Sequence, residues 1–307
     1  MFGSRPLHIA KSLWEGGFHS LTSLMRIILL SKYFINYKKD DNHEECVILG
    51  NGPSLNNFLN NYPDFLHDRA TIAVNYFVRS VDDYKAIRPD HYVIVSPEYW
   101  QGEQKEGWHD DRMKTFQLIA EHTQWKMKLF VPAFAKKHKK WLKEIGNNDC
   151  IEVVYFNNIA IEGFQWLTHW AYRNNLGMPR PHNVLIGAIL FAINLKYSTI
   201  YVAGAEHSWL KDIQITGTNE VLLSQKHFYE SKKEHIKSVF SDGKARPMYV
   251  GGSSQARKLH EVLEKFYYTF RSYWELQNYA VSRGIHIFNI TEESFIDAFK
   301  RYHINHG

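Results

Sequence analysis

Cys46-Val-Ile-Leu-Gly-Asn-Gly-Pro-Ser-Leu55 is the stretch from which the fold is predicted. Four apolar residues, a Gly-Asn-Gly-Pro-Ser turn and a restart of the pattern indicate a buried strand that runs into a helix. Gly50 and Gly52 allow a sharp turn and a close approach to a ligand, while Pro53 suits a first helical turn and Ser54 its cap. The expected result is an anion site at the end of a first strand, where nucleotides bind in open α/β sheets. The alternative is a tight strand-to-helix turn without a ligand.

Length and composition favour one large α/β domain. The chain has 307 residues, 44% of them hydrophobic, which is enough for a sizeable core. The net charge of +5 is compatible with anionic nucleotides, lipopolysaccharide or a membrane surface. No Lys/Arg block alternates with aromatic residues, so we expect no nucleic-acid partner. Cys46 and Cys150 show neither disulfide nor zinc spacing, which favours structural thiols and a cytoplasmic location.

Apolar runs and turn residues predict a mainly parallel sheet with flanking helices. Strands are expected at Cys46–Leu49, Thr71–Phe77, Arg88–Pro97, Lys128–Val131, Ile151–Phe156, Ser198–Gly204 and Ile285–Ile290. Helices are expected at Asn56–Phe65 (or a loop there), Lys136–Lys143 with a solvated basic surface, Asn183–Leu195, Ser254–Arg283 and Glu292–Arg301. The polar region of about 208–252 predicts a lid. We therefore expect one domain over 41–307, preceded by a separate segment.

Residues 1–40 predict an amphipathic helix and no signal peptide. The apolar residues recur at spacings of four and three, at Trp14, Phe18, Leu21, Met25 and Ile28. Lysines follow the helix, and such a segment can lie in a membrane interface. A peripheral contact of residues 10–40 with the inner face of the cytoplasmic membrane is therefore one interpretation. The other is a helix docked on the domain's own core, and the apolar periodicity is the same in both cases.

Polar residues follow four of the predicted strands. They are Asn51 and Ser54, Asn75, Ser96, and the run Glu206-His207-Ser208. A single polar residue at a strand end usually caps the next helix. Four such ends at one edge of a parallel sheet instead predict a polar cleft for a substrate.

The Gly50–Leu55 stretch with Asn75 resembles the bacterial family 42 sialyltransferases and the related motility-associated-factor (Maf) glycosyltransferases. Pro181–Gly187 and Tyr201–Gly204 resemble the second half of that family's nucleotide site, so that the resemblance covers about 160 residues. It implies a variant of the GT-A nucleotide-binding fold and an inverting transfer of an acidic sugar, sialic acid or a Kdo-like sugar, from a CMP-sugar donor. The implied acceptor is a bacterial surface glycan or a lipid-linked oligosaccharide. No metal cofactor is implied, and no Asp-x-Asp follows any predicted strand.

The resemblance also assigns donor-binding roles to individual residues. Asn51, Gly52 and Ser54, with Pro53 in the same turn, would contact the phosphate and ribose, and Asn75 the ribose or sugar. Ser96 stands where the family often has Asn, Asn183 falls near a family Arg, and Tyr249 matches a phosphate-contacting Tyr of the lid. The remaining positions expected in the nucleotide-sugar site are Gly204, Ser208 and Tyr229.

The chain departs from the family at the catalytic histidine. The family's Gly-His-Ser step reads Gly251-Gly252-Ser253 here, so the general base must lie elsewhere. The candidates are His207 and His227, and Glu206 would either orient a ring or act as the base. Each histidine has the alternative of an ordinary core or surface residue. Two further functions stay open: a Mg/ATP-dependent enzyme like the pterin pyrophosphokinases, and a non-catalytic scaffold of a glycan assembly complex.

Overall fold

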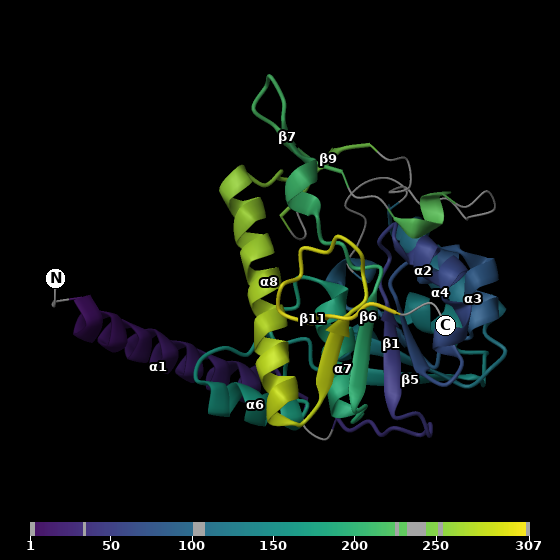
Figure 1. The fold of residues 1–307 in the computed structure, drawn as a ribbon, viewed down its shortest axis with the longest axis horizontal. Coiled ribbons are helices and arrows are strands. Elements are labelled where there is room, and N and C mark those ends of the chain that lie inside the picture. Colours follow the sequence, from purple (N-terminus) through teal and green to yellow (C-terminus); the bar gives the residue numbers. More distant parts are fainter. Residues whose placement is uncertain are drawn as a thin grey trace.

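Eight parallel strands form the central sheet of this protein. The computed structural model describes residues 4–32, 35–100, 108–224, 227–231, 244–250 and 254–304. The strand order is β11-β10-β6-β1-β2-β3-β4-β5, and every neighbouring pair is parallel (Figure 1). The strands span Glu45–Leu49 (β1), Ala70–Val74 (β2), His91–Val93 (β3), Met127–Pro132 (β4), Ile151–Phe156 (β5), Thr199–Ala203 (β6), His286–Asn289 (β10) and Lys300–Arg301 (β11). The predicted α/β class with a mainly parallel sheet is confirmed.

Helices cover both faces of the sheet. One face carries α7 (Val184–Asn194) and α8 (Leu259–Ser282), whose buried residues share a core with Cys46 and Ile48 of β1. The other face carries α2 (Leu55–Asn61), α3 (Val81–Ile87), α4 (Trp108–His122) and α5 (Lys139–Ile145), packed against Val47 and Leu49. Because successive side chains of a strand point to opposite faces, the unbroken apolar run of β1 supplies both cores.

The order of the strands reverses at β1. From β1 the chain continues through β2, β3, β4 and β5 in one direction, and it returns to place β6 on the other side of β1. β1 therefore pairs with both β2 and β6. In sheets of this kind, ligands bind outside the carboxyl ends of the strands, near the point where the strand order reverses. The segments at that point are the glycine loop Gly50–Ser54 after β1 and the loop 204–208 after β6.

Two predicted helices are wrong or incomplete. Glu292–Arg301 forms no helix, because side chains of this region hold its backbone in turns before the short strand β11. Ser294 Oγ donates to the Ala205 carbonyl at 2.6 Å, and Arg301 Nη1 donates to the Thr291 carbonyl at 3.2 Å. The basic stretch Lys136–Lys143 divides at His138 into a 3₁₀ turn and α5, and Trp141 in its middle is fully buried.

Further helices and several short 3₁₀ turns connect the strands. Helix α4 and helix α6 (Gln165–Arg173) were not predicted, because their apolar residues are interspersed with His, Asp and Trp. The 3₁₀ turns are Pro63–Leu66, Phe77–Arg79, Pro97–Tyr99, Ala133–Lys137, Trp209–Asp212 and Phe228–Ser231.

The described part of the predicted lid contains a small antiparallel sheet. Its strands are β7 (Ile213–Ile215), β8 (Val221–Leu223) and β9 (Arg246–Pro247). Val221 and Leu223 pack on Val262 and Phe266 of α8 in a third apolar cluster. Figure 1 shows this sheet beyond one end of α8. Residues 225–226, 232–243 and 251–253 of the region lie outside the described residues.

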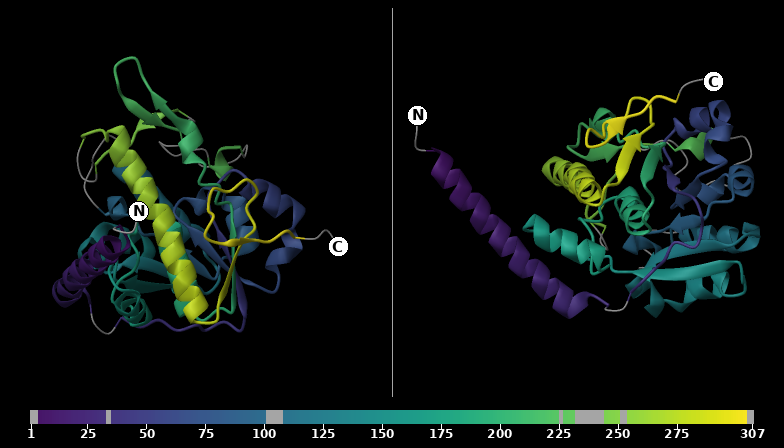
Figure 2. Two further views of the ribbon diagram at one scale, coloured as in Figure 1. Left: turned by 60° about the vertical axis from the view of Figure 1, so that its left-hand side comes forward. Right: turned by 60° about the horizontal axis from the view of Figure 1, so that its bottom comes forward.

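Helix α1 (Ser4–Leu30) extends from the rest of the protein as an arm (Figures 1 and 2). Its C-terminal part contacts the body, and the chain then passes along residues 35–44 to β1. The predicted helix in residues 1–40 is confirmed over this span. No helix in the described part of the chain combines the length and the apolar composition that a bilayer span requires.

Candidate functional site

The glycine loop after β1 packs directly against the loop after β6. The N–H of Gly50 donates to the Ala203 carbonyl, and the N–H of Gly52 donates to the Gly204 carbonyl, both at 2.8 Å. A Cβ atom on Gly50 would lie 2.4 Å from the Gly204 carbonyl oxygen, and Gly204 itself has φ +63°. Side chains cannot be added at these positions without moving backbone. The glycines therefore serve the contact between the two loops that follow β1 and β6.

A carboxylate already occupies the start of α2. The Ser54 N–H donates to Glu206 Oε1 at 2.6 Å, and a Cβ on Gly52 would lie 1.5 Å from Glu206 Oε2. The Ser54 hydroxyl makes no cap bond, and Oγ is buried without a hydrogen-bond partner among the described residues. The expected anion position at Ser54 thus holds the protein's own anion, and the free donor there is the Ser54 hydroxyl.

Two asparagine side chains lie at the ends of neighbouring strands. Asn51 Nδ2 donates to the Val74 carbonyl at 3.0 Å, which joins the end of β1 to the end of β2. Asn75 has φ +47°, a conformation that Asn adopts more readily than most residues. Oδ1 of both side chains is buried and accepts no hydrogen bond from a described residue. Buried acceptors of this kind normally have partners, so the pair is a candidate for contact with a donor-bearing ligand.

His227 belongs to a segment that docks on the glycine loop. The N–H of Phe228 donates to the Asn51 carbonyl at 3.0 Å, and Asn56 Nδ2 donates to the Phe228 carbonyl at 2.7 Å. His227 Nδ1 lies 2.9 Å from Glu230 Oε1, with the two side chains 22% and 15% exposed. When Nδ1 donates to that carboxylate, Nε2 is an acceptor. The arrangement is a partly exposed His–carboxylate pair beside the loop of Asn51.

His207 occupies a different environment. It is buried, and its Nε2 lies 3.0 Å from the Tyr273 hydroxyl of α8. The ring also contacts Trp209, with 4.1 Å between ring centroids. Burial lowers the pKa of His207 to about 3, so the ring is neutral at physiological pH. Its surroundings are those of a buried core residue.

Tyr229 is also buried. Its hydroxyl makes no hydrogen bond with a described residue, and burial raises the pKa of Tyr229 well above its ordinary value. Tyr229 stacks on the His227 ring, with ring centroids 5.1 Å apart. In this conformation it supports His227 and does not present its hydroxyl to solvent.

The other predicted site residues take varied positions. Asn183 caps α7, because its Oδ1 accepts from the Leu185 N–H at 2.8 Å. Ser96 and Ser208 precede 3₁₀ turns and are half-buried, and Pro53 is exposed. Tyr249 forms an isolated bridge with Ala256, near the start of α8. The Gly251–Ser253 step that replaces the family histidine lies outside the described residues.

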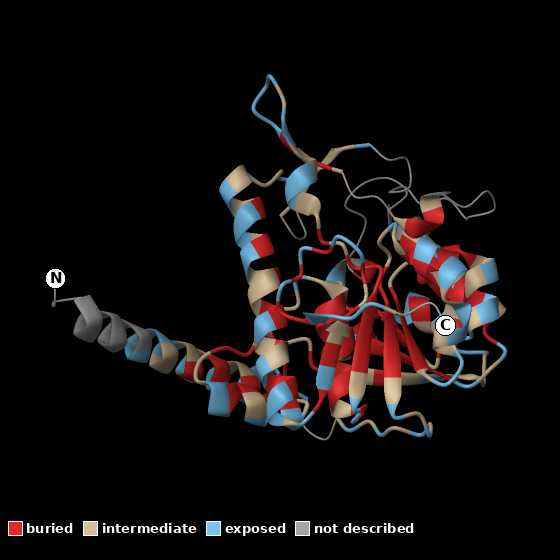
Figure 3. Cartoon of the chain, viewed as in Figure 1, coloured by how far each residue is buried: buried red, intermediate tan, exposed pale blue. Residues whose placement is uncertain are grey.

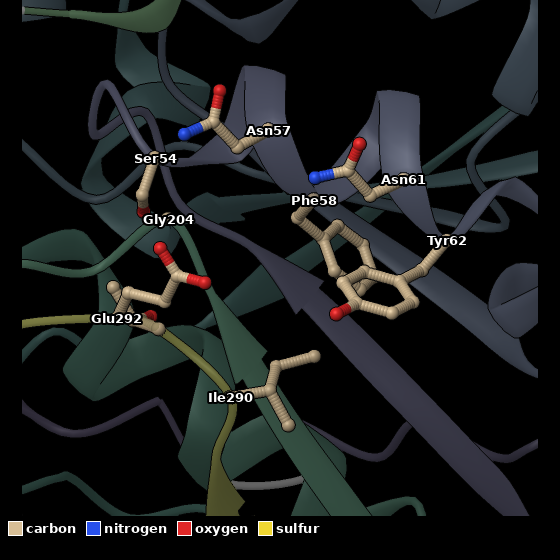
Figure 4. Close-up of a pocket in the computed structure, with 9 residues that line it drawn as sticks. Ser54, Asn57, Phe58, Asn61, Tyr62, Gly204, Ile290 and Glu292 are labelled. Atoms are coloured by element: carbon tan, nitrogen blue, oxygen red, sulfur yellow. The ribbon is translucent and has the colours of Figure 1, made fainter. Parts of the chain in front are cut away.

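A small hollow of about 20 Å³, partly open to solvent, lies beside these two loops. α2 supplies the ring of Phe58, Tyr62 follows that helix, and Ile290 and Glu292 come from the segment after β10 (Figure 4). In Figure 4 the Glu292 carboxylate lies between Ser54 and Ile290. The remaining lining residues are Asn57, Asn61, Gly204 and Thr291. The cavity combines an apolar wall with amide groups and one carboxylate, and it touches both loops of the strand-order reversal.

Sequence reasoning missed three polar residues of this edge. Glu230 could have been predicted as a partner of His227, because it lies three residues further along the chain. Asn158 follows β5, donates to the Val95 carbonyl at 3.3 Å, and has a buried Oδ1 with no described partner. The rule that found Asn75, a polar residue after a strand, applies to Asn158 equally. Glu292 was hidden because the segment was assigned to a helix.

Among the described residues, no group of three or more His, Cys, Asp or Glu side chains is arranged to hold a metal ion. Comparison with known proteins adds no relative: no protein-family model matches the chain, and no curated protein matches it significantly.

Proposed function

We propose that this protein is a glycosyltransferase of a GT-A-like type that transfers an acidic sugar from a CMP-sugar, with inversion and without a metal. The observation that carries the proposal is the pair of buried, unpartnered oxygens of Asn51 and Asn75 at the ends of β1 and β2. Amide oxygens accept hydrogen bonds from hydroxyl groups, of which a ribose and a sugar carry several. The position beside the strand-order reversal and the resemblance of Gly50–Leu55 to sialyltransferases support the same assignment.

The hollow beside α2, which would have to widen to admit a base, is the proposed site of the cytosine. Phe58 and Tyr62 offer apolar ring surfaces to a flat base. The Glu292 carboxylate can accept from the exocyclic amino group of cytosine, a pairing that carboxylates make with this base. Uracil has an oxygen at the same position, so the carboxylate would disfavour UMP.

The CMP phosphate then lies over the glycine loop. Because Glu206 holds the Ser54 N–H at 2.6 Å, we assign phosphate binding to the Ser54 hydroxyl instead of the backbone donor. This differs from the expectation that free N–H groups of the turn bind the phosphate. The ribose lies between the cytosine and the phosphate, and the acidic sugar extends from the phosphate toward Asn51 and Asn75.

His227 is the proposed general base. The acceptor hydroxyl oxygen bonds to the anomeric carbon, and the bond from that carbon to the CMP phosphate oxygen breaks with its electron pair remaining on the phosphate. The hydroxyl proton passes to Nε2 of His227. Glu230, 2.9 Å from Nδ1, orients the ring and stabilises the imidazolium that forms.

Nucleotide binding tests this proposal most directly. We would measure melting temperature and calorimetric affinity with CMP, CDP, UDP, GDP and ATP, each with and without Mg²⁺, since a ligand of the native state raises its melting temperature. The expected result is selective binding of CMP that Mg²⁺ does not change. Glu292→Lys should shift the preference from CMP toward UMP.

Other outcomes contradict the proposal in distinguishable ways. Preference for Mg-ATP would favour the pyrophosphokinase-like alternative, and preference for UDP or GDP would mean a different donor. Binding of none of these nucleotides, or of any CMP-sugar, would favour the non-catalytic scaffold.

A further inference from the structure

The apolar stripe of α1 faces away from the protein. Its members, spaced by four and three residues, are 54–74% exposed: Trp14, Phe18, Leu21, Met25 and Ile28. Figure 3 shows exposed residues along the described part of the arm. Contiguous apolar patches on a protein surface mark sites of interaction with a partner or a membrane. This orientation excludes the interpretation in which the stripe packs on the domain's own core.

The opposite face of α1 attaches the helix to the body through small residues. Ser23 Oγ donates to the Glu162 carbonyl and accepts from the Glu162 N–H, both at 2.8 Å. Ser20 Oγ accepts from the Phe164 N–H at 2.9 Å, and Ser31 Oγ donates to the Leu176 carbonyl at 2.6 Å. Ile27 is the buried apolar residue between them, at 3% exposure. These bonds set the rotation of the helix, so the stripe is held outward.

Two tryptophans lie on the neighbouring helix α6. Trp166 and Trp170 are four residues apart, which places them on one side of the helix, and they are 68% and 46% exposed. α6 begins directly after Phe164, the residue that donates to Ser20 of α1. Figures 1 and 2 both show α6 beside the attached part of α1. Indole rings are preferred at membrane–water interfaces, because they combine an apolar body with a polar N–H.

The charge of these two helices has one predominant sign. Residues 4–30 contain Arg5, Lys11 and Arg26 against the single acid Glu15, and α6 contains Arg173 and no acid. Arg26 contacts the body, where its Nη1 lies 3.8 Å from Glu162 Oε2. An apolar stripe with basic residues along the same helix is typical of segments that lie in the interface of an anionic bilayer.

We infer that α1 and α6 form a membrane-docking face, defined by the outward stripe of α1 together with Trp166 and Trp170. The stripe enters the headgroup region of an anionic lipid bilayer, and the helix lies in the plane of the surface. The serine contacts of α1 with residues 162–176 hold the body against that surface. This inference does not rest on the proposed function.

Flotation of the full chain with lipid vesicles tests the inference. Vesicles of equal parts phosphatidylcholine and phosphatidylglycerol are compared with vesicles of phosphatidylcholine alone, at low and high salt. The test variant is Phe18→Gln/Met25→Gln. The control, Leu210→Gln/Ile215→Gln, removes two exposed apolar side chains near β7, at 44% and 56% exposure. Light scattering of each protein reports the oligomeric state.

The expected result is binding of the native chain to the anionic vesicles, weaker binding to phosphatidylcholine, and partial loss at high salt. The α1 variant should bind at least about tenfold more weakly, because it loses two apolar side chains that would enter the interface. The control should bind like the native chain. Equal vesicle binding by the α1 variant and the native chain would overturn the inference. The inference would also be overturned if the native chain were a dimer, the α1 variant were a monomer, and neither protein floated with the vesicles.

Discussion

Glu206 Oε1 accepts a 2.6 Å hydrogen bond from the backbone N–H of Ser54, across a separation of 152 residues in the chain. The bond joins the loop after β6 to the loop after β1, where the strand order of the sheet reverses. It also places a negative charge where the glycine loop was expected to receive a phosphate. The bond makes Glu206 a structural partner of the glycine loop, and under the proposed function it limits how the nucleotide phosphate could approach Ser54.

Gly52→Ala should destabilise the protein by about 1–3 kcal/mol, the usual cost of overpacking. The added Cβ would lie 1.5 Å from Glu206 Oε2 and 2.7 Å from the Gly204 carbonyl oxygen. The matched control is Gly17→Ala in helix α1, where nothing lies within 4 Å of the new atom. That control should gain up to about 1 kcal/mol from helix propensity. Denaturant unfolding measures both, and equal effects would contradict the close contact.

The losses of stability caused by Glu206→Ala and Gly52→Ala should not add in the double variant. Each single change disturbs the same contact, so the double variant should lose less than the sum of the two, by about 0.5–3 kcal/mol. The free energies of unfolding of the four proteins give this coupling. Strict additivity would mean that the Gly204 carbonyl alone limits position 52.

Asn75→Gly should weaken CMP-sugar binding by up to about tenfold and leave the melting temperature nearly unchanged. Glycine tolerates the φ of +47°, so the substitution removes the unpartnered oxygen with little change in backbone conformation. Asn219→Gly is the control, since Asn219 has φ +61° on an exposed turn. Calorimetry should separate the two variants. A similar loss of affinity in both would remove Asn75 from the proposed site.

His227→Gln should lower the turnover of a CMP-sugar by about 10²–10⁴, the range for loss of a general base, and leave CMP affinity almost unchanged. The control is His67→Gln. His67 Nδ1 lies 3.5 Å from Asp64 Oδ1, but these side chains are 72% and 90% exposed, and neither lines the cavity beside α2. Transfer rates and CMP affinities of the two variants form the test. Unchanged turnover in His227→Gln would require another base.

Asp41 should contribute stability that depends on pH. Burial by itself raises the pKa of Asp41. The nearby His91 ring, 3.7 Å away, and hydrogen bonds from the Tyr197 hydroxyl and the His43 N–H together lower it to about 2, from 3.8. Because the folded pKa is lower than the unfolded one, the contribution, roughly 2 kcal/mol, is complete above pH of about 4 and is lost toward pH of about 2. Asp41→Asn should lack this dependence. Asp64→Asn, at a 90% exposed side chain, is the control in acid unfolding.

Short apolar runs were enough to predict most of the sheet. The strands near Cys46, Thr71, Lys128, Ile151 and Ser198 contain apolar runs whose length and flanking turns admit few alternatives. The polar residues after β1, β2 and β6 were found by the same reasoning, because parallel strands end at one edge. The segment 292–301 was predicted wrongly, because its backbone is held by bonds to residues such as Ala205, far away in the chain.

By itself, the sequence determined the α/β class, the parallel sheet, the glycine loop at the end of β1 and a helix with an apolar stripe near the N-terminus, since these follow from local periodicity. Only the tertiary structure decided that the stripe faces outward and that Glu206 occupies the Ser54 N–H. It likewise showed that His207 is a core residue, whereas His227 docks beside Asn51. The reason is physical: these properties depend on contacts between segments that are distant in the chain, and no local pattern carries that information.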